Sequence, residues 1–561
     1  MEESKRKRIL TIVALSILLP SVFYGFFKFE GAKAFPSSNP ATLNFSKISG
    51  FLPNLGNGFP IFTDKFQANS ESNYTISGNG TLSISNGSAI VNGSAFVMAS
   101  NSAPFQVCNL CTKMTVASCS GTGQFGVHIY SDPSNYVALE YNPSTCVWSL
   151  IQNVSGIASV VMTSLSNVSC PFTMALILQG KNAVGYYTTD GETWIQICNN
   201  NNIEHNIYWD MRFAVAQSLW RSGFVSSMNS LTISSFSAFY SEGLTYRDER
   251  PITYAAGQPF LFQNCLYYAV DLGGNGIRET VQGIVSWNLT SNQLNVISLL
   301  YYNRTDSGTG KIGIFSDGAG DIFFDQETET WHDFFVTWGS NDLDHELELW
   351  QATLPFNPLT THGVQIIRGG LRVALSPVTN QSVYDPVVYK IGSEWYLYVI
   401  DTNGYAGWST VYPHLAESSD LDSWTNVYCN TSYSGREGCG MFLMGKIPYL
   451  TTSDGKYYNA TTGIQMGTFS FWDNSTKYNP WTIPEGIKGK YYLLTFTCDL
   501  QYRIWYGYGV GILETYTDPA VAAHILISSL SSPVASNRFI PVTGTAQDLS
   551  FKNQKLNKLT R

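Results

Sequence analysis

One short unit, a turn followed by an aromatic strand, recurs along the second half of the chain and constrains the fold more than any other feature. Its clearest copy covers residues 383–400, which read VYDPVVYKIGSEWYLYVI. The pattern predicts two antiparallel strands joined by a tight turn at Gly392, because glycine adopts the backbone angles that such turns need. The second strand is rich in aromatic and β-branched residues, as buried strands are.

Related units come before and after this copy. The aromatic strands recur about every sixty residues, except for the last. Propeller repeats of short strands, in which each blade is one small sheet, are typically about forty to fifty residues, and insertions in loops can lengthen them. We therefore expect an all-β chain with a five-bladed propeller over residues 246–517. The alternative interpretation is a tyrosine-rich all-β domain with unrelated hairpins. The five aromatic strands cover residues 266–270, 331–336, 395–400, 456–458 and 490–494.

The segments DPVVYKIGSEWYLY and PEGIKGKYYLLTF resemble blades of the five-bladed propeller glycosidases, the group of arabinanases, β-xylosidases and invertases. In that group, Asp-Pro in an innermost strand and Glu-Gly ahead of a Tyr-Tyr-Leu strand bring carboxylates to the central axis. The resemblance covers residues 246–517. It implies catalytic roles for Asp385 and Glu485, and it places Asp321, or Asp317, at the equivalent position of the second blade.

Glycoside hydrolysis needs an acid and a base or nucleophile that face one sugar. Glu437, which precedes a glycine, is a rival to Glu485 as the acid. In the family the first blade carries the general-base aspartate before its proline, but here that place is Gln258, which cannot take a proton from water. Asp248 or Asp271 could substitute from nearby, although neither matches the motif. For each carboxylate the alternative role is a loop cap or turn former.

The first half predicts a different β architecture. Many short alternating segments separated by turns indicate a β-sandwich over residues 61–243. The motifs FTDKF, YVALEYN and YYTTDGETW resemble concanavalin A-like jelly rolls, which often accompany glycosidases as carbohydrate-binding or packing domains. The expected strands are residues 81–85, 89–91, 126–130, 136–141, 147–152, 172–179, 183–188, 212–216 and 230–240.

Aromatic residues make up 14% of the chain, which is common in sugar-binding β proteins. In the second half, Trp338, Trp395 and Trp481 are the candidates for substrate binding. In the first half, stacking on sugar rings is one interpretation of four tryptophans and burial in the core is the other. These four are Trp148, Trp194, Trp209 and Trp220.

The chain begins with the basic cluster Lys5-Arg6-Lys7-Arg8, and an apolar run extends from Ile9 to Phe27. This is a signal peptide or a single membrane-spanning helix. The pattern Ala32-Lys33-Ala34 favours cleavage, whereas the length of the run favours an uncleaved anchor. Both interpretations place the rest of the chain outside the cell, because the basic cluster stays inside. The flanking segments are then residues 1–34 as leader or anchor, 35–60 as linker and 520–561 as tail.

Composition supports an extracellular protein. Asn-x-Ser/Thr glycosylation sites cluster between Asn73 and Asn92. The ten cysteines divide evenly into six before residue 245 and four after it, which predicts disulfides within two separate domains but not their pairing. They are Cys108, Cys111, Cys119, Cys146, Cys170, Cys198, Cys265, Cys429, Cys439 and Cys498.

The expected function is an extracellular glycosidase-like protein that hydrolyses or binds polysaccharide through the propeller axis. The alternative is a non-catalytic surface or virion glycoprotein that uses the same scaffold for glycan or host recognition. The aspartate missing at Gln258 favours the alternative, whereas Asp385 and Glu485 favour the enzyme. A net charge of −9 argues against nucleic acid as a partner, and no metal or cofactor motif is evident.

Overall fold

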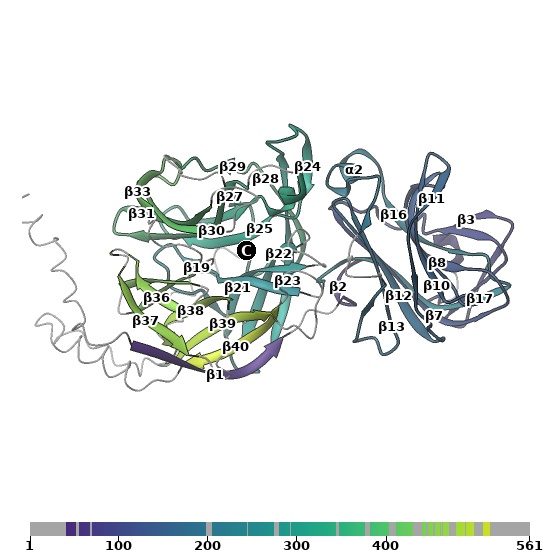
Figure 1. Ribbon diagram of the computed structural model, residues 1–561, viewed down its shortest axis with the longest axis horizontal. Helices are drawn as coiled ribbons and strands as arrows, with labels where there is room; N and C mark the ends of the chain where they lie inside the picture. Colours follow the sequence, from purple (N-terminus) through teal and green to yellow (C-terminus); the bar gives the residue numbers. More distant parts are fainter. Residues whose placement is uncertain are drawn as a thin grey trace, which may run out of the picture.

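The structure is a computed structural model, and Figure 1 shows two β-rich halves side by side. For several strands, β1 and β38 to β40 among them, it describes the backbone alone. No helix in the described part of the chain is long and apolar enough to span a membrane. The predicted leader and C-terminal tail lie outside the described residues. The structure describes residues 41–516 except 52–54, 68–69, 198–204, 244, 274–279, 292, 344–346, 376–381, 403–410, 430–439, 445–446, 453–454, 461, 463, 471–477, 488–489 and 499–508.

In the first half, two antiparallel sheets pack face to face, as the alternating sequence pattern predicts. Trp148 and Tyr187, one from each sheet, stack with ring centroids 5.5 Å apart. One sheet has the order β11 (Ile157–Leu165), β10 (Val147–Val154), β9 (Asn135–Asn142), β8 (Phe125–Asp132), β16 (Arg221–Ser226), β6 (Ala95–Met98) and β3 (Thr75–Gly78). The other has the order β14 (Ile195–Gln196), β13 (Asn182–Thr188), β12 (Phe172–Gln179), β7 (Asn109–Ser120), β17 (Ser230–Ser241), β5 (Ser88–Asn92) and β4 (Thr81–Ser85), with β15 (His205–Asn206) beside β13 and β2 (Gly58–Asp64) beside β17.

The predicted strand at residues 212–216 is wrong. This segment forms helix α2 (Met211–Gln217), which packs against β24 (Ile312–Phe315) of the second half. The side chain of Asp210 accepts a hydrogen bond from the Arg212 N–H at 3.1 Å and so caps the helix. The alternation of Phe213 and Val215 favours a strand, but the cap and the packing of the helix decide the local structure.

The second half is a series of antiparallel meanders, each named here by its first strand. The β18 meander contains β18 (Thr245–Pro251), β21 (Cys265–Gly273), β22 (Thr280–Asn288) and β23 (Leu294–Thr305), with β24 and β28 (Gly363–Arg368) beside β23. The β25 meander contains β25 (Gly318–Asp325), β26 (Thr330–Val336), β27 (Leu349–Leu354) and β29 (Leu371–Arg372). The β30 meander contains β30 (Ser382–Ile391), β31 (Glu394–Thr402), β32 (Val411–Ser418) and β33 (Thr425–Cys429).

Two further meanders complete the described part of this half. The β34 meander contains β34 (Gly440–Met444), β35 (Ile447–Thr451), β36 (Lys456–Asn459) and β37 (Gln465–Ser470). The β38 meander contains β38 (Tyr478–Ile487), β39 (Lys490–Cys498), β40 (Gly509–Tyr516) and β1 (Ala41–Phe51). Neighbouring first strands contact one another: β18 with β25, β25 with β30, β30 with β34, β34 with β38, and β38 with β18.

Three details test the repeat that the sequence predicts. The hairpin around Gly392 is confirmed, because β30 pairs with β31 and Gly392 has φ +65°. The fourth copy is displaced by one strand: residues 456–458 lie in β36, the third strand of the meander, whereas the second strand is β35. Residues 41–51 of the predicted linker form β1, which pairs with β40 and β37.

The two halves share one hydrophobic core. Residues of the β18 meander, such as Tyr268, Trp287 and Tyr301, belong to the same buried cluster as the sandwich core.

The six cysteines whose side chains the structure describes are free thiols. Cys108 and Cys111 are fully buried, and burial raises the pKa of the Cys108 thiol to about 12. The disulfides predicted from the sequence therefore stay a prediction.

Candidate functional site

The same backbone irregularity occurs in four first strands of the second half. In β18, Asp248 and Glu249 together face one residue of the neighbouring strand β21. Ala319-Gly320 in β25, Asp385-Pro386 in β30 and Asn479-Pro480 in β38 repeat this two-against-one arrangement. Such β-bulges turn side chains in new directions and are frequent next to active sites. The bulges therefore mark corresponding positions in four first strands.

The first residue of three of these bulges has a left-handed backbone. The φ angles are +49° at Asp248, +50° at Ala319 and +51° at Asp385. Such angles are uncommon for residues other than glycine, although aspartate tolerates them better than most. Backbone of this kind is concentrated at functional sites. The repeat makes Asp248 and Asp385 equivalent positions of two meanders.

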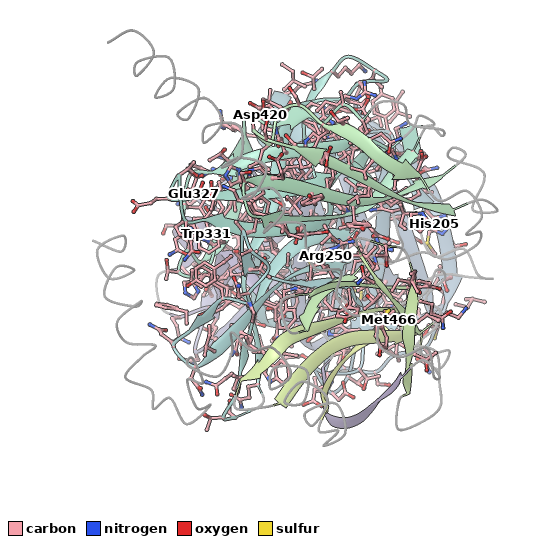
Figure 2. The ribbon with its side chains drawn as sticks, turned by 90° about the vertical axis from the view of Figure 1, so that its left-hand side faces the viewer. His205, Arg250, Glu327, Trp331, Asp420 and Met466 are labelled. Carbon is pink, nitrogen blue, oxygen red and sulfur yellow. The ribbon has the colours of Figure 1, made fainter. Side chains whose placement is uncertain are left out.

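Asp385 is paired with a buried arginine. Arg250 Nη2 lies 2.7 Å from Asp385 Oδ1, and the exposed fraction of the side chain is 0% for Arg250 and 11% for Asp385. Burial alone would lower the pKa of the Arg250 guanidinium, but Asp385, Asp248 and Asp321 together raise it. Figure 2 labels Arg250 near the centre of the view, Glu327 at the left and Asp420 in the upper part. Arg250 therefore carries a fixed positive charge among the carboxylates of three meanders.

Asp248 is the more exposed of the two equivalent carboxylates. Its side chain is 16% exposed, and Asp248 Oδ2 lies 3.4 Å from Arg247 Nε. Burial raises the pKa of Asp248 to about 7. The negative charges of Asp271 and Asp385 also raise this pKa, whereas the positive charges of Arg247 and Arg250 lower it. A carboxyl group with this pKa can hold a proton near neutral pH and donate it to a leaving group, as a general acid must.

Asp321 does not occupy the position equivalent to Asp385, because the register places Ala319 there. Asp321 instead directly follows the bulge and is 3% exposed. Its Oδ2 accepts a hydrogen bond from the Val388 N–H at 2.7 Å, which ties β25 to β30. Burial raises the pKa of Asp321 to about 7. Through this hydrogen bond, Asp321 helps to hold β30 in place just after its bulge.

Asp271 supports the bulge of β25 in a similar way. Its Oδ1 accepts the N–H of Ala319 at 2.9 Å, and its Oδ2 lies 3.7 Å from Arg247 Nη2. A Cβ at Gly318 would overlap this carboxylate, and a Cβ at Gly320 would overlap the side chain of Gln282. The sequence Gly-Ala-Gly in β25 therefore lets polar side chains of the β18 meander approach the bulge.

Glu485 does not occupy the bulge position of its strand. It lies in a second irregularity of β38, beside the hairpin in which Ile487 faces Lys490, and Asn479 occupies the bulge position. Six residues of strand separate Asn479 from Glu485, roughly 20 Å at about 3.3 Å per residue. The register therefore places Asn479, and not Glu485, at the position in β38 that Asp385 occupies in β30. Glu437 and the side chain of Trp481 lie outside the described residues.

The two described candidate tryptophans are both buried. Trp395 is 3% exposed and packs on Phe323 with ring centroids 5.4 Å apart, so it belongs to the core between β25 and β31 rather than to an open sugar site. Trp338 is 7% exposed, but it lies beside the bulges: it stacks on Tyr384 at 5.2 Å, and the guanidinium carbon of Arg247 is 5.9 Å from its ring. In the first half, Trp148 and Trp220 are core residues.

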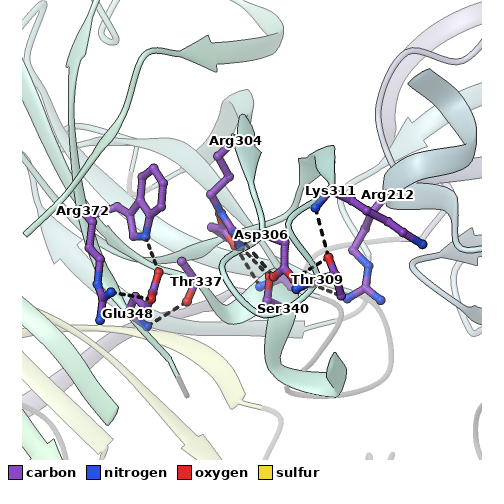
Figure 3. Close-up of polar contacts among 12 residues, drawn as sticks. Arg212, Arg304, Asp306, Thr309, Lys311, Thr337, Ser340, Glu348 and Arg372 are labelled. Carbon is purple, nitrogen blue, oxygen red and sulfur yellow. Dashed lines mark hydrogen bonds and ion pairs between the residues drawn. The ribbon is translucent and has the colours of Figure 1, made fainter. Parts of the chain in front are cut away.

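A buried polar network extends from the sandwich toward Trp338, as Figure 3 shows in part. Arg212 of helix α2 donates to the Gly339 carbonyl at 2.5 Å and pairs with Asp210 at 2.6 Å. The Gly339 N–H donates to Asp317, which Arg304 holds through two hydrogen bonds of 2.6 and 2.8 Å. Asp317 thus holds, through Gly339, the segment after Trp338 that Arg212 contacts from the sandwich.

The sequence contains signals for part of this site. Tyr384-Asp385-Pro386 and Tyr478-Asn479-Pro480 share a pattern that marks the bulge in both strands. The run Arg247-Asp248-Glu249-Arg250 places four charges in a row within a β segment, although charged residues are 13% of the chain. No group of three or more metal-ligating side chains stands close enough to hold a metal ion among the described residues.

No protein-family model matches the chain, and no curated protein matches its sequence. Several solved structures resemble it distantly. Levansucrase of Bacillus subtilis is 10% identical with a TM-score of 0.35, covering 49% of this chain and 86% of that one. Zg3597, a family 117 glycoside hydrolase of Zobellia galactanivorans, is 12% identical with a TM-score of 0.35, covering 49% and 87%. The carbohydrate-binding module CBM66 of Bacillus subtilis is 12% identical with a TM-score of 0.23, covering 30% and 95%. The chain thus has a distant resemblance in fold to such proteins.

Proposed function

We propose that the second half is a five-bladed β-propeller spanning residues 246–517, with β1 as the outer strand of its last blade. Each meander is one blade, and the cyclic contacts of the first strands from β18 through β38 and back to β18 support the ring. The bulges then lie around one central axis. The first half is the proposed concanavalin A-like sandwich, spanning residues 61–243.

Within this ring, we propose that the protein hydrolyses glycosidic bonds of external polysaccharide. The observation that carries the proposal is the pair Asp248 and Asp385, which occupy the same bulge position of the first and third blades with partly exposed carboxyl groups. The blade between them has only the methyl group of Ala319 at this position. Hydrolysis needs two carboxyl groups with different protonation. Asp248 is the proposed acid, and Asp385, held by Arg250, is the proposed base or nucleophile.

A second candidate function is glycan binding without hydrolysis, as in a surface or virion glycoprotein. It is favoured by the absence of a carboxylate at Ala319 and at Asn479, and by the ion pair that already engages Asp385. The carboxylates of Asp248 and Asp385, which are 16% and 11% exposed, would then accept hydrogen bonds from sugar hydroxyl groups, while buried Arg250 holds Asp385 in place.

Hydrolysis of oligosaccharides tests these two functions. Arabinan, xylan, mannan and fructan oligosaccharides would be incubated with the parent protein and with Asp248→Asn, Asp385→Asn and Asp422→Asn. Asp422 lies on an exposed turn and is the control. The proposed hydrolase releases sugar, both bulge variants lose at least about 100-fold in kcat, and the control retains activity. Sugar binding without release by the parent would support the second candidate and refute hydrolysis.

We propose an extracellular location, with the apolar run from Ile9 to Phe27 as a signal peptide or membrane anchor. Three predicted glycosylation sites, Asn79, Asn86 and Asn92, are exposed at the surface, as attached glycans require. Sensitivity of the expressed protein to an amidase that removes N-linked glycans would test this location. Resistance, together with retention in the cytosolic fraction, would contradict it.

A further inference from the structure

Two cysteines of the sandwich lie side by side. The Sγ atoms of Cys119 and Cys170 are 3.5 Å apart. Cys119 lies near the end of β7, and Cys170 lies two residues before the start of β12. The pairing between these two strands ends where Phe172 faces Val116. Both cysteines therefore lie just beyond the hydrogen-bonded ladder, where a covalent bond could extend the connection.

Three of the other described cysteines lie elsewhere, whereas Cys146 lies beside Tyr141, a residue that Cys119 also approaches. Cys108 is buried in the core that both halves share, whereas Cys111 belongs to a separate cluster on the opposite face of the same sheet. Cys265 lies in the second half, in β21. Cys146 approaches the Pro143 carbonyl at 3.9 Å. Among the cysteines that the structure describes, Cys119 and Cys170 are thus the pair with adjacent sulfur atoms.

We propose that Cys119 and Cys170 form a disulfide in the exported protein. The two thiols lose two protons and two electrons, and an external small-molecule or protein disulfide takes them up and is itself reduced to two thiols. An oxidising compartment outside the cytosol supplies such oxidants. The structure describes the reduced form, in which the sulfur atoms need to move closer by less than 2 Å to reach a bond length of about 2 Å.

The position of this bond gives it a structural role. It would join β7 of one sheet to the connection, residues 166–171, that arrives from β11 of the other sheet. The same connection contains Val168, whose N–H and C=O both hydrogen-bond to the Tyr141 hydroxyl at 3.2 Å. The two cysteines are 51 residues apart in sequence, so the cross-link would restrict a long loop of the unfolded chain.

Peptide mapping tests the bond directly. The secreted full chain would be alkylated without reduction and digested with trypsin and chymotrypsin together, because trypsin alone leaves residues 114–181 in one peptide. Cleavage after Phe125, Tyr141 and Trp148 separates Cys119, Cys146 and Cys170. The expected product is a cross-linked pair of peptides containing Cys119 and Cys170. Alkylation of both residues, or a link from either one to another cysteine, would overturn the proposal.

Thermal unfolding of variants gives an independent test. Without reductant, Cys119→Ser, Cys170→Ser and the double variant should each lower the Tm by the same several degrees, because each removes the same bond. With reductant, the three variants and the parent should unfold at a similar Tm, because any other disulfides are then broken in all four proteins. A double variant that loses the sum of the two single effects, or single variants that keep the parent Tm without reductant, would contradict the assignment.

Discussion

Asp248 and Asp385 occupy the same position of a repeated β-bulge, with φ angles of +49° and +51°, although 137 residues (385 minus 248) separate them in sequence. Arg250, two residues after Asp248, forms a 2.7 Å ion pair with Asp385. The geometry joins the first and third meanders through one buried charge. Asp248 and Asp385 are therefore candidate functional residues, and the ion pair between Arg250 and Asp385 also connects two meanders of the second half.

Replacement of Arg250 by methionine should be strongly destabilising. The change leaves the carboxylate of Asp385 without its buried partner, which costs about 3–5 kcal/mol of unfolding free energy. Denaturant unfolding would measure the loss. Lys390→Met is a matched control, because Lys390 also has a 2.7 Å ion pair, but its partner Glu327 is 74% exposed. That exposed pair should contribute about 0–1 kcal/mol. Similar losses in the two variants would contradict the role of burial.

Stability should fall as pH rises from about 4.5 to 7.5. Burial raises the pKa of Asp248, Asp321 and Asp333 to about 7. Between the unfolded pKa of about 3.9 and this value, the folded state holds protons that the unfolded state has released, so higher pH favours unfolding. Each of the three groups should decrease the free energy of unfolding by up to about 1.4 kcal/mol per pH unit, and the decrease should level off above the folded pKa.

Denaturant unfolding at several pH values, for the parent and for Asp333→Asn, would check this dependence. The variant removes one of the three groups and should show a shallower slope. Asp190 and Asp420 have pKa values lowered by hydrogen bonds from backbone N–H groups, so their contribution disappears only as pH falls below the chosen range. Stability that rises between pH 4.5 and 7.5 would refute the prediction.

Gly318→Ala should destabilise the second half by about 1–3 kcal/mol, as overpacking of a close contact does. The new Cβ would overlap the Asp271 carboxylate and disturb the hydrogen bond that this group accepts from Ala319. Gly370→Ala is the control, since a Cβ there would meet neighbours no closer than 3.4 Å. Its stability should stay within about 0.5 kcal/mol of the parent. Equal effects of the two substitutions in chemical denaturation would exclude this steric explanation.

Arg212→Ala should loosen the contact between the two halves. It removes the hydrogen bond to the Gly339 carbonyl and leaves Asp210 without its 2.6 Å partner. We expect a loss of about 3 kcal/mol and faster hydrogen exchange of the amides around Gly339. Arg221→Ala is the comparison, because Arg221 binds the Ser102 carbonyl within the sandwich. Hydrogen exchange of the amides around Gly339 should not change in Arg221→Ala. A change of similar size in that variant would show that the loosening does not depend on the Arg212 contact.

Much of the β structure could be predicted from local sequence, because strand period and turn chemistry act over a few residues. The hairpin at Gly392 and the alternating strands of the sandwich follow from these short-range rules. The segment at residues 212–216 is one exception, because a capping side chain and contacts with β24 stabilise a helix despite an alternating pattern. The predicted linker, part of which forms β1, and the displaced fourth repeat are two others.

The site depended on information that the sequence holds only indirectly. The sequence by itself identified Asp385 and the repeat around it, and it offered Asp248 as a substitute for the missing carboxylate. Only the tertiary structure showed that Ala319, rather than Asp321, is equivalent to Asp385, and that Glu485 lies far along its strand. Strand register decides these positions, and register is set by pairing and burial between segments far apart in the chain. For the same reason, only the structure could bring Cys119 and Cys170 together.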